Sequence, residues 1–182
     1  MLALLVPLPA AGTARAEALP SQPQSLPAWQ GALTRHPRLS QREQALQLAL
    51  THRQQGGRPF AALLVRDNQL VASAVNRMLE AGDPTRHAEL EALREGSRQG
   101  PLAGAIVYAS GHPCPMCLSA LVMNGIQAVY YAFDNDDAAP FGYDSRAAYA
   151  ALRLPLCPPP LPLIKLASPI AAETLYGPLP HA

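Results

Sequence analysis

Two short stretches, about thirty residues apart, carry side chains able to bind a metal ion. The first places His87 two residues before Glu89, and the second places Cys114 and Cys117 within one helical turn. A helix beginning near each stretch would point the free N–H groups of its first turn at the same spot, which favours thiolates over thiols. One imidazole and two thiolates leave the fourth position of a tetrahedral zinc ion to water, which is typical of a catalytic site. The spacing therefore predicts one zinc ion per chain, bound by His87, Cys114 and Cys117.

The residues around these stretches resemble a known family. The pattern His-x-Glu at 87–89 followed by Pro-Cys-x-x-Cys at 113–117 is similar to that of the zinc-dependent cytidine and nucleobase deaminase superfamily. Within it, Asp83 to Thr85 and Leu118 to Ala120 most resemble the bacterial guanine deaminases. The likeness runs from about Pro59 to Tyr149, and the joint pattern is far more specific than a lone Cys-x-x-Cys. The resemblance implies hydrolytic deamination of a free aminated purine or related heterocycle, with guanine favoured.

Hydrophobic periodicity and turn residues predict the elements that position these side chains. A capping box at Ser40 to Glu43 predicts a helix that ends at Gly56-Gly57. The remaining pattern predicts strands over 60–65 and 70–75 joined by a turn, a loop over 77–83, a helix from about 87, a strand over 106–109, a helix over 113–123, a strand over 129–133, a helix over 145–152, a strand over 163–166 and a helical turn over 170–176. This order is that of a three-layer α/β/α, cytidine-deaminase-like fold with a mixed five-stranded sheet.

Composition limits the partners that the chain can bind. Charged residues make up 15% of the 182 residues, the net charge is +1, and Lys165 is the single lysine. A nucleic-acid surface would require clustered basic side chains, so a small-molecule substrate is expected and a nucleic-acid partner is not. Of the three cysteines, two belong to the metal motif, and a disulfide framework is not indicated. By analogy with relatives we expect a homodimer.

The N-terminal part predicts a separate segment. We expect residues 1–39 to be a leader and a proline-rich arm, and residues 40–182 to be the deaminase domain. Leu2 to Gly12 is apolar and precedes a small-x-small site at 14–16, but no basic residue stands before it, and it is too short and proline-broken to span a membrane. A signal peptide over 1–16 would make the protein periplasmic or exported, and otherwise it would be cytoplasmic. A disordered leader and a start codon upstream of Met1 are the alternatives.

Two alternatives concern the metal site itself. A closed structural zinc site would need a fourth ligand, either Cys157 or His112, but Pro113 separates His112 from the helix and would direct it elsewhere. Glu89 could be a solvated acid like Glu91 and Glu95 on the same helix. The resemblance instead implies that Glu89 is the catalytic proton shuttle.

Four further residues are expected at the substrate. The resemblance places Asn76, at the end of the second strand, against the base, with Phe60, Ala88 and Asp137 around it. A carboxylate at Asp137 would accept from the N–H and amino groups of a guanine-like edge. The alternatives are a strand-ending residue for Asn76, a core residue for Phe60 and a charged surface turn for Asp137. Ala61 stands where related deaminases carry glycine, which limits how closely the backbone approaches a ligand.

Other functions remain to be separated from guanine deamination. Relatives usually carry glutamate where this chain has His112, and an imidazole there changes the charge beside the metal helix. A tRNA adenosine deaminase would share the zinc motifs, and guanosine or another aminated heterocycle would suit the same chemistry. A zinc-stabilised binding module without activity is the alternative from another class. Such a module would have no use for Glu89, which argues against it.

Overall fold

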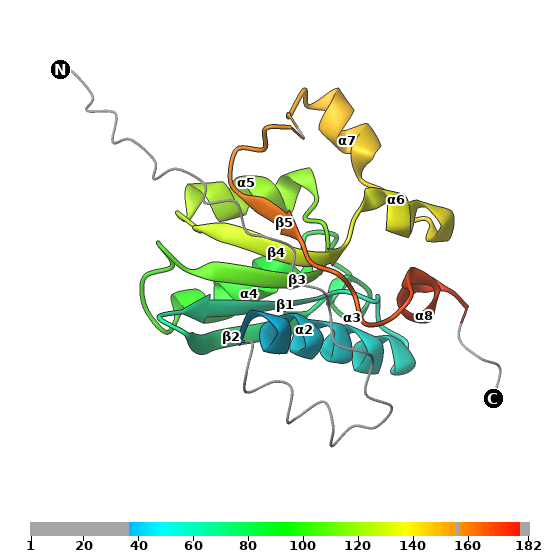
Figure 1. Cartoon of the computed structure of the whole chain (residues 1–182), viewed down its shortest axis with the longest axis horizontal. Coiled ribbons are helices and arrows are strands. Elements are labelled where there is room, and N and C mark those ends of the chain that lie inside the picture. Colours follow the sequence, from blue (N-terminus) through cyan, green and yellow to red (C-terminus); the bar gives the residue numbers. More distant parts are fainter. Residues whose placement is uncertain (1–36, 156, 179–182) are drawn as a thin grey trace.

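The computed structural model describes residues 37–155 and 157–178 (Figure 1). Its elements are α2 (Pro37–Gln54), β1 (Ala61–Arg66), β2 (Gln69–Val75), α3 (Met78–Ala81), α4 (Ala88–Ser97), β3 (Ile106–Gly111), α5 (Pro115–Met123), β4 (Ala128–Phe133), α6 (Asn135–Ala138), the 3-10 helix η1 (Ala139–Phe141), α7 (Arg146–Ala151), β5 (Leu163–Lys165) and α8 (Ala172–Tyr176). The predicted leader, and the predicted arm up to residue 36, lie outside the described residues. Within the described part, no helix is long and apolar enough to cross a membrane.

The strands form one mixed sheet of five strands in the order β2-β1-β3-β4-β5. Strand β1 is antiparallel to both β2 and β3, whereas β3, β4 and β5 run parallel to one another. The predicted fold class, a three-layer α/β/α arrangement around a mixed five-stranded sheet, is confirmed.

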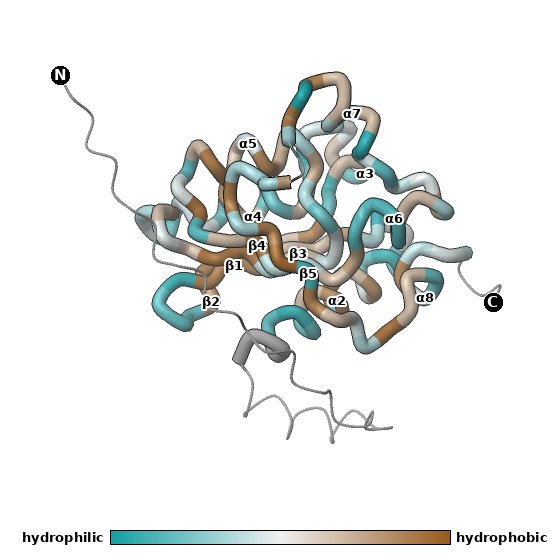
Figure 2. The backbone as a smooth tube through the Cα atoms, turned by 45° about the horizontal axis from the view of Figure 1, so that its top comes forward, coloured by the Kyte–Doolittle hydropathy of each residue, from teal (hydrophilic) through white to brown (hydrophobic). Residues whose placement is uncertain are grey.

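Alternate residues of the central strands face opposite layers of helices. Leu64, Val107 and Val129 belong to the core cluster that also holds buried residues of α4 and α5. Their neighbours Leu63 and Tyr108 belong to the cluster that contains Ala45 of α2. Because side chains alternate across a strand, a sheet buried on both faces needs apolar residues at every position. Figure 2 shows this hydrophobic colour along the strands at the centre of the molecule.

Helix α2 begins earlier than the sequence pattern predicts. It starts at Pro37, so Ser40 lies inside the helix and the predicted capping box is wrong. A proline suits a helix start, because its missing N–H would have no intrahelical partner there. Glu43, the other half of the predicted box, instead pairs with Arg42 at 3.4 Å.

The C-terminal end of α2 agrees with the prediction. Gly56 has φ of +87°, and its N–H donates to the Arg53 carbonyl at 2.9 Å. The N–H of Gly57 donates to the His52 carbonyl at 3.0 Å. This pair of bonds is a Schellman motif, in which glycine supplies the left-handed residue that ends the helix.

Helix α8 is fastened to this end of α2. The Arg53 guanidinium donates to the carbonyl of Thr174 at 2.7 Å and also to the carbonyl of Gly177. Leu175 and Tyr176 of α8 are buried and pack in a cluster with α2 and the end of β4. The chain's last described helix therefore closes against its first.

The sheet is irregular at both outer strands. Asp67 and Asn68 have φ of 51° and 61°, which is the two-residue turn that suits a tight hairpin between β1 and β2. The pairing of β1 with β2 shifts register between Leu64 and Val65, which marks a β-bulge. At the opposite edge, β5 has three residues.

Two segments contain helices that the sequence pattern did not predict. The predicted loop over 77–83 contains α3, whose end is formed by Gly82 at φ of +60°. After β4, Asp134 caps α6 with its side chain, which accepts from the N–H groups of Asp136 and Asp137. Both helices have four residues, too few for a helical period to be visible in the sequence.

The strand register brings four chain segments together at one end of the strands. Ala61 pairs with Val75, Ala62 with Ala109, and Gly111 with Phe133. The start of β1 therefore lies beside the ends of β2, β3 and β4. The segments that enter or leave those strands carry Phe60, Asn76, His112 to Cys114 and Asp134 to Asp137.

Candidate functional site

The three predicted metal ligands meet at this end of the strands, where two helices begin. His87 is the N-cap residue of α4, Cys114 is the N-cap residue of α5, and Cys117 lies in the first turn of α5. The Cys114 and Cys117 sulfurs are 3.6 Å apart, and each lies 3.6 Å from Nδ1 of His87. Zinc ligands at the usual distances, about 2.3 Å for sulfur and about 2.0 Å for nitrogen, lie roughly 3.5–3.8 Å apart in a tetrahedron. The three donor atoms therefore fit one tetrahedral zinc ion.

The ionisation of these groups also favours a cation. The pKa of Cys114 is lowered to about 4, chiefly because the Cys117 thiol donates a hydrogen bond to it. The pKa of Cys117 is raised, because one proton is shared between two close sulfurs and the site is buried. The hydrogen bond with Cys114 raises the pKa of His87. A divalent cation would replace that shared proton and let both sulfurs bind as thiolates.

No fourth side chain completes the ligand set among the residues that the structure describes. His87, Cys114 and Cys117 are the His, Cys, Asp or Glu residues grouped with donor atoms within 4.8 Å of one another. Cys157, one of the two alternatives for a closed site, is exposed. The other, His112, has its Nδ1 at 3.0 Å from the Pro113 carbonyl, and its ring packs against Tyr131. The described geometry therefore favours a site with one free coordination position.

Glu89 lies beside this cluster and away from solvent. Its side chain is buried, and the Cys117 thiol lies 3.6 Å from its Oε2. Burial, and next the charge of Cys114, raises the pKa of Glu89 to about 7. Glu95, farther along α4, is exposed and pairs with Arg98 at 2.8 Å. The two acids of one helix thus have opposite environments, and Glu89 is not a solvated surface acid.

Glu91 differs from its description as a solvated acid. It is 3% exposed and accepts from Nη2 of Arg86 at 2.9 Å, and it also pairs with Arg94. Arg86 directly precedes His87, so this ion pair fixes the segment that enters the metal site. A Glu-x-x-Arg spacing at 91–94 is a sequence signal for the second pair.

Tyr149 of α7 is a supporting residue that the sequence pattern did not identify. Its side chain is 1% exposed, and its hydroxyl donates to the Pro113 carbonyl at 2.7 Å. Pro113 immediately precedes Cys114. The bond therefore holds the turn that presents both thiols, from a helix 36 residues away in the chain.

Asn76 and Phe60 lie together at the same end of the strands. The N–H of Asn76 donates to the Phe60 carbonyl at 3.0 Å, and the N–H of Arg77 donates to the Arg86 carbonyl at 2.8 Å. Asn76 is 4% exposed, and its Oδ1 accepts from the N–H of Met78 at 3.1 Å. Asn76 and Arg77 together thus connect the start of β1 to the segment that precedes the metal ligand His87.

An aromatic group surrounds Phe60. Its ring centroid lies 5.2 Å from that of Tyr143 and 5.6 Å from that of Tyr176. A Cβ atom built on Gly111 would come within 3.0 Å of the Tyr176 hydroxyl and 3.2 Å of the Phe60 ring. The glycine at the end of β3 is therefore what allows both rings to approach the strand. No sequence pattern pointed to Tyr176, which is brought here by the attachment of α8 to α2.

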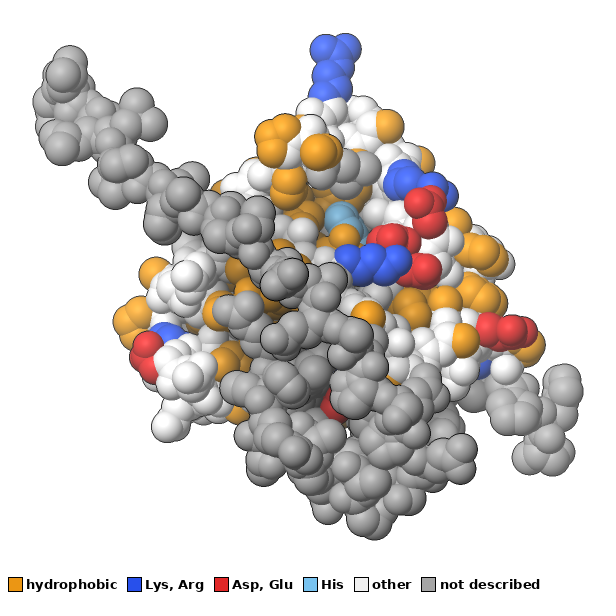
Figure 3. Space-filling model, viewed as in Figure 1, with side chains coloured by type: hydrophobic (Ala, Val, Ile, Leu, Met, Phe, Trp, Pro, Cys, Tyr) orange, Lys and Arg blue, Asp and Glu red, His pale blue; other side chains and the backbone are white. Residues whose placement is uncertain are grey.

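Asp137 is held by other protein groups. Its Oδ2 accepts from the N–H of Asp134 at 2.9 Å and pairs with Nζ of Lys165 at 2.6 Å. Lys165 pairs equally closely with Asp134. On the face drawn in Figure 3, some acidic and basic side chains lie next to one another. Asp137 therefore caps α6 and joins it to β5.

Ala88 directly follows the metal ligand His87. Ala88 is the first residue of α4, and its side chain is buried in the core beneath that helix.

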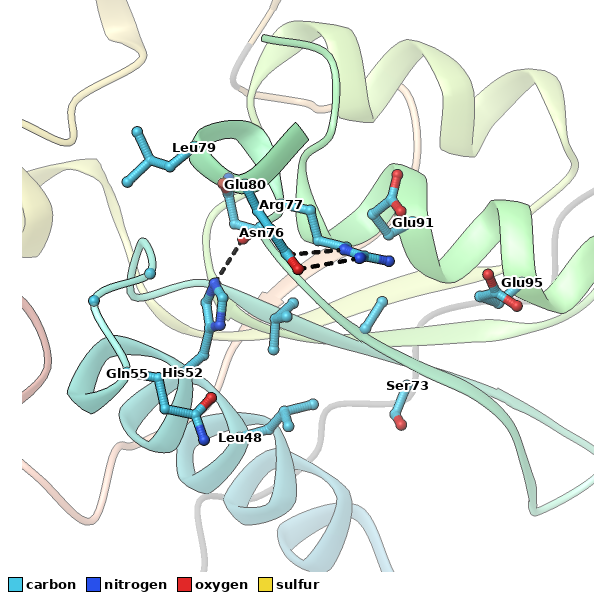
Figure 4. A pocket seen from close by; sticks show the side chains of 14 residues that line it. Leu48, His52, Gln55, Ser73, Asn76, Arg77, Leu79, Glu80, Glu91 and Glu95 are labelled. Carbon is cyan, nitrogen blue, oxygen red and sulfur yellow. Dashed lines mark hydrogen bonds and ion pairs between the residues drawn. The ribbon is translucent and has the colours of Figure 1, made fainter. Parts of the chain in front are cut away.

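A groove of about 850 Å³ runs along β2 between α2 and α4, and Asn76 forms part of its wall (Figure 4). The three metal-binding residues do not line this groove. It is therefore a neighbour of the candidate site and not the site itself.

The metal cluster predicts how zinc content responds to substitution. We expect about one zinc ion per chain, measured by elemental mass spectrometry of the purified protein. That zinc should be lost in Cys114→Ser and in Cys117→Ser. The control is Cys157→Ser, which removes an exposed thiol outside the cluster and should retain zinc. Full zinc retention in both motif variants would contradict the site.

The Tyr149 hydrogen bond gives a second prediction. Tyr149→Phe should lower the free energy of unfolding by about 1 kcal/mol, the usual value of one intramolecular hydrogen bond. For a chain of this size that corresponds to a fall of about 2–4 °C in Tm. The matched control is Tyr176→Phe, since the buried Tyr176 hydroxyl has no hydrogen-bond partner within the described part of the chain. Equal losses in the two variants would show that the Pro113 contact contributes nothing.

Known proteins resemble this chain in sequence and in structure. Among curated sequences, the guanine deaminase of Bacillus subtilis (strain 168) is 37% identical over 102 residues, which cover 54% of this chain and 65% of that protein. The tRNA-specific adenosine deaminase of Agrobacterium fabrum is 34% identical over 100 residues, which cover 51% of this chain and 66% of that protein. The chain thus spans slightly less than two thirds of these relatives.

Solved structures give the same pair of similarities. The guanine deaminase from Bacillus subtilis superposes with a TM-score of 0.60 at 32% identity, over 71% of this chain and 85% of that one. A tRNA:A34 deaminase superposes with a TM-score of 0.57 at 25% identity, over 72% of this chain and 100% of that one.

A family profile covers the segment that holds the metal donors and Glu89. The cytidine and deoxycytidylate deaminase zinc-binding region matches residues 39–133, which is more than half of the chain and includes His87, Glu89, Cys114 and Cys117. Together with the sheet order and the three-donor cluster, this match shows that the chain belongs to the zinc-binding cytidine and deoxycytidylate deaminase family.

Proposed function

We propose that this protein is a hydrolytic deaminase of a free aminated purine, and that guanine is its favoured substrate. The observation that carries this proposal is the buried carboxyl group of Glu89, whose Oε2 lies 3.6 Å from a sulfur of the three-donor cluster. A structural metal site gains nothing from a buried acid that does not bind the metal, since burial of an unpaired carboxylate is costly. The similarity to a guanine deaminase supports the choice of substrate.

The proposed reaction exchanges an exocyclic amine for an oxygen. His87, Cys114 and Cys117 would hold zinc, which when bound supplies a Lewis acid that makes water nucleophilic at neutral pH. Glu89 accepts a proton from the attacking water at its Oε2 and passes it to a ring nitrogen. After the carbon–oxygen bond forms, Glu89 helps to protonate the departing amine. Guanine and water are thereby converted to xanthine and ammonia.

We assign substrate recognition to the groups at this end of the strands. Because Oδ1 of Asn76 already accepts from the Met78 amide, its Nδ2 is the group we propose to donate to the base. The aromatic face of Phe60, held by Tyr143 and Tyr176, offers an apolar wall for a flat ring. Ala88 would contribute through its backbone N–H, which at the first residue of a helix has no intrahelical acceptor. Asp137 would contact the base through Oδ1, since its Oδ2 holds Lys165.

A second candidate is deamination of adenosine in tRNA. The similarity to tRNA adenosine deaminases, at 34% identity in sequence and 25% in structure, favours it. The composition argues against it, because the 14 lysine and arginine side chains are balanced by 13 acids, which leaves a net charge of only +1 for contact with a phosphate backbone. The acidic run from Asp134 to Asp137 adds negative charge near the site.

The first test of the proposal compares substrates. Ammonia release should be measured with guanine, guanosine, adenine, cytosine and an aminated triazine, and inosine formation with an anticodon-loop tRNA. We expect guanine to be deaminated at least ten-fold faster than the other bases, with no inosine in the tRNA, because the Asn76 and Asp137 groups suit a guanine edge. Inosine formation without action on guanine would establish the second candidate instead.

The second test separates catalysis from metal binding. Glu89→Gln keeps the size and hydrogen-bonding capacity of the side chain but cannot carry a proton near neutral pH. We expect turnover to fall by about 10²–10⁴-fold, the usual scale for a positioned acid–base group, while zinc content and Tm stay unchanged. Substrate binding should be affected less than turnover, because the lost interaction is made mainly in the transition state.

The matched control is Glu95→Gln on the same helix. Glu95 is exposed and pairs with Arg98, so its substitution should leave turnover unchanged. A Glu89→Gln variant with near-normal turnover would show that Glu89 does not move the proton. A variant that loses its zinc would make Glu89 part of the metal site.

A further inference from the structure

A histidine outside the zinc motif is bonded to the backbone of Asn76. His52 lies in the last turn of α2, and its Nε2 is 2.7 Å from the Asn76 carbonyl oxygen (Figure 4). A carbonyl oxygen can only accept, so Nε2 must carry the proton and donate it. The ring therefore joins the end of a helix on one face of the sheet to the end of β2.

The place of the His52 ring is made by the residue that ends α2. An ideal Cβ atom on Gly57 would lie 2.0 Å from Nε2 of His52 and 2.3 Å from Cε1. Any side chain at 57 would thus occupy the space of the ring. The Schellman motif holds Gly57 there, because the N–H of Gly57 donates to the carbonyl of His52 itself. The backbone of His52 therefore fixes Gly57, and Gly57 in turn leaves room for the His52 ring.

The bond from His52 completes a set that fixes Asn76 on several sides. The N–H of Asn76 is held by Phe60, and its Oδ1 by the N–H of Met78. The peptide that follows is held by the bond from Arg77 to the Arg86 carbonyl, next to His87. The carbonyl of Asn76 belongs to that same peptide, so the His52 bond sets the plane in which the Asn76–Arg77 connection runs.

We infer that His52 is a positioning residue for substrate binding: its Nε2–H holds the Asn76 carbonyl and thereby aims the Asn76 amide at the base. This inference rests on the proposed function, in which the amide contacts the substrate. His52 lines the groove along β2 together with Asn76, and it is not one of the three metal donors. Its effect is therefore expected in substrate affinity and not in the chemical step.

The test uses variants that remove, keep or displace the donor. His52→Leu removes the N–H donor, and His52→Gln keeps an N–H group of comparable reach. Gly57→Ala displaces the imidazole ring while His52 itself stays unchanged. The control is Gln55→Ala, which changes the wall of the same groove beside His52. Steady-state kinetics with the best substrate of the panel, zinc content and Tm are measured for each protein.

We expect His52→Leu and Gly57→Ala to raise KM about five- to ten-fold, the scale of one lost hydrogen bond, with kcat nearly constant. His52→Gln should restore KM to within about two-fold, and Gln55→Ala should not change it. A purely structural role would instead lower the fraction of folded, zinc-loaded enzyme, which reduces apparent kcat at constant KM. The Gly57→Ala variant carries the test if His52→Leu does not fold.

Two results would overturn the inference. One is a normal KM in both His52→Leu and Gly57→Ala, and the other is a loss of kcat alone that His52→Gln does not restore. An unmodified protein that deaminates no member of the panel would instead refute the proposed function, and that result is obtained before any variant is made.

Discussion

The site depends on a narrow geometric requirement, which is that three donor atoms from two helices lie 3.6 Å from one another. Two of the donors, Cys114 and Cys117, satisfy it locally, because a helix that begins at an N-cap cysteine brings the residue three positions later to the same side. The third, Nδ1 of His87, must be delivered by a separate helix. The antiparallel pairing of β1 with both β2 and β3 makes that delivery, because it places the ends of β2 and β3, which lead to His87 and to Cys114, at the same end of the sheet.

Two glutamates of α4 are buried near the metal donors, and their surroundings differ. Among the described residues Glu89 has no cationic partner and lies against the cluster, whereas Glu91, two residues along the helix, is neutralised by Arg86 and Arg94. A paired buried charge costs little beyond its desolvation, but an unpaired one is held in place only by the surrounding fold. The contrast between two glutamates of one helix therefore separates a residue available for proton transfer from one that fixes the helix start.

The zinc motif and most elements could be predicted because their signals are local. The spacing of Cys114 and Cys117, the alternating strands and the glycines after α2 each act within a few residues. The start of α2 was missed because Pro37 suits a helix start as well as the Ser40 box does. The ion pair of Asp137 with Lys165, the Tyr149 bond to Pro113 and the contact of His52 with Asn76 span 24 to 36 residues and are set by sheet topology. No pattern in the chain encodes such distances before the sheet is known.

The irregular outer strands have a consequence for how copies of this chain can associate. An unpaired strand edge is a template for further strands, and proteins protect it by shortening or bulging the edge. Here β2 is bulged against β1 at Leu64 and Val65, and β5 at the other edge has three residues. The bulge twists β2 locally, and the shortness of β5 leaves few free backbone groups at that margin. Both features disfavour the addition of a strand from another copy at either edge of the sheet.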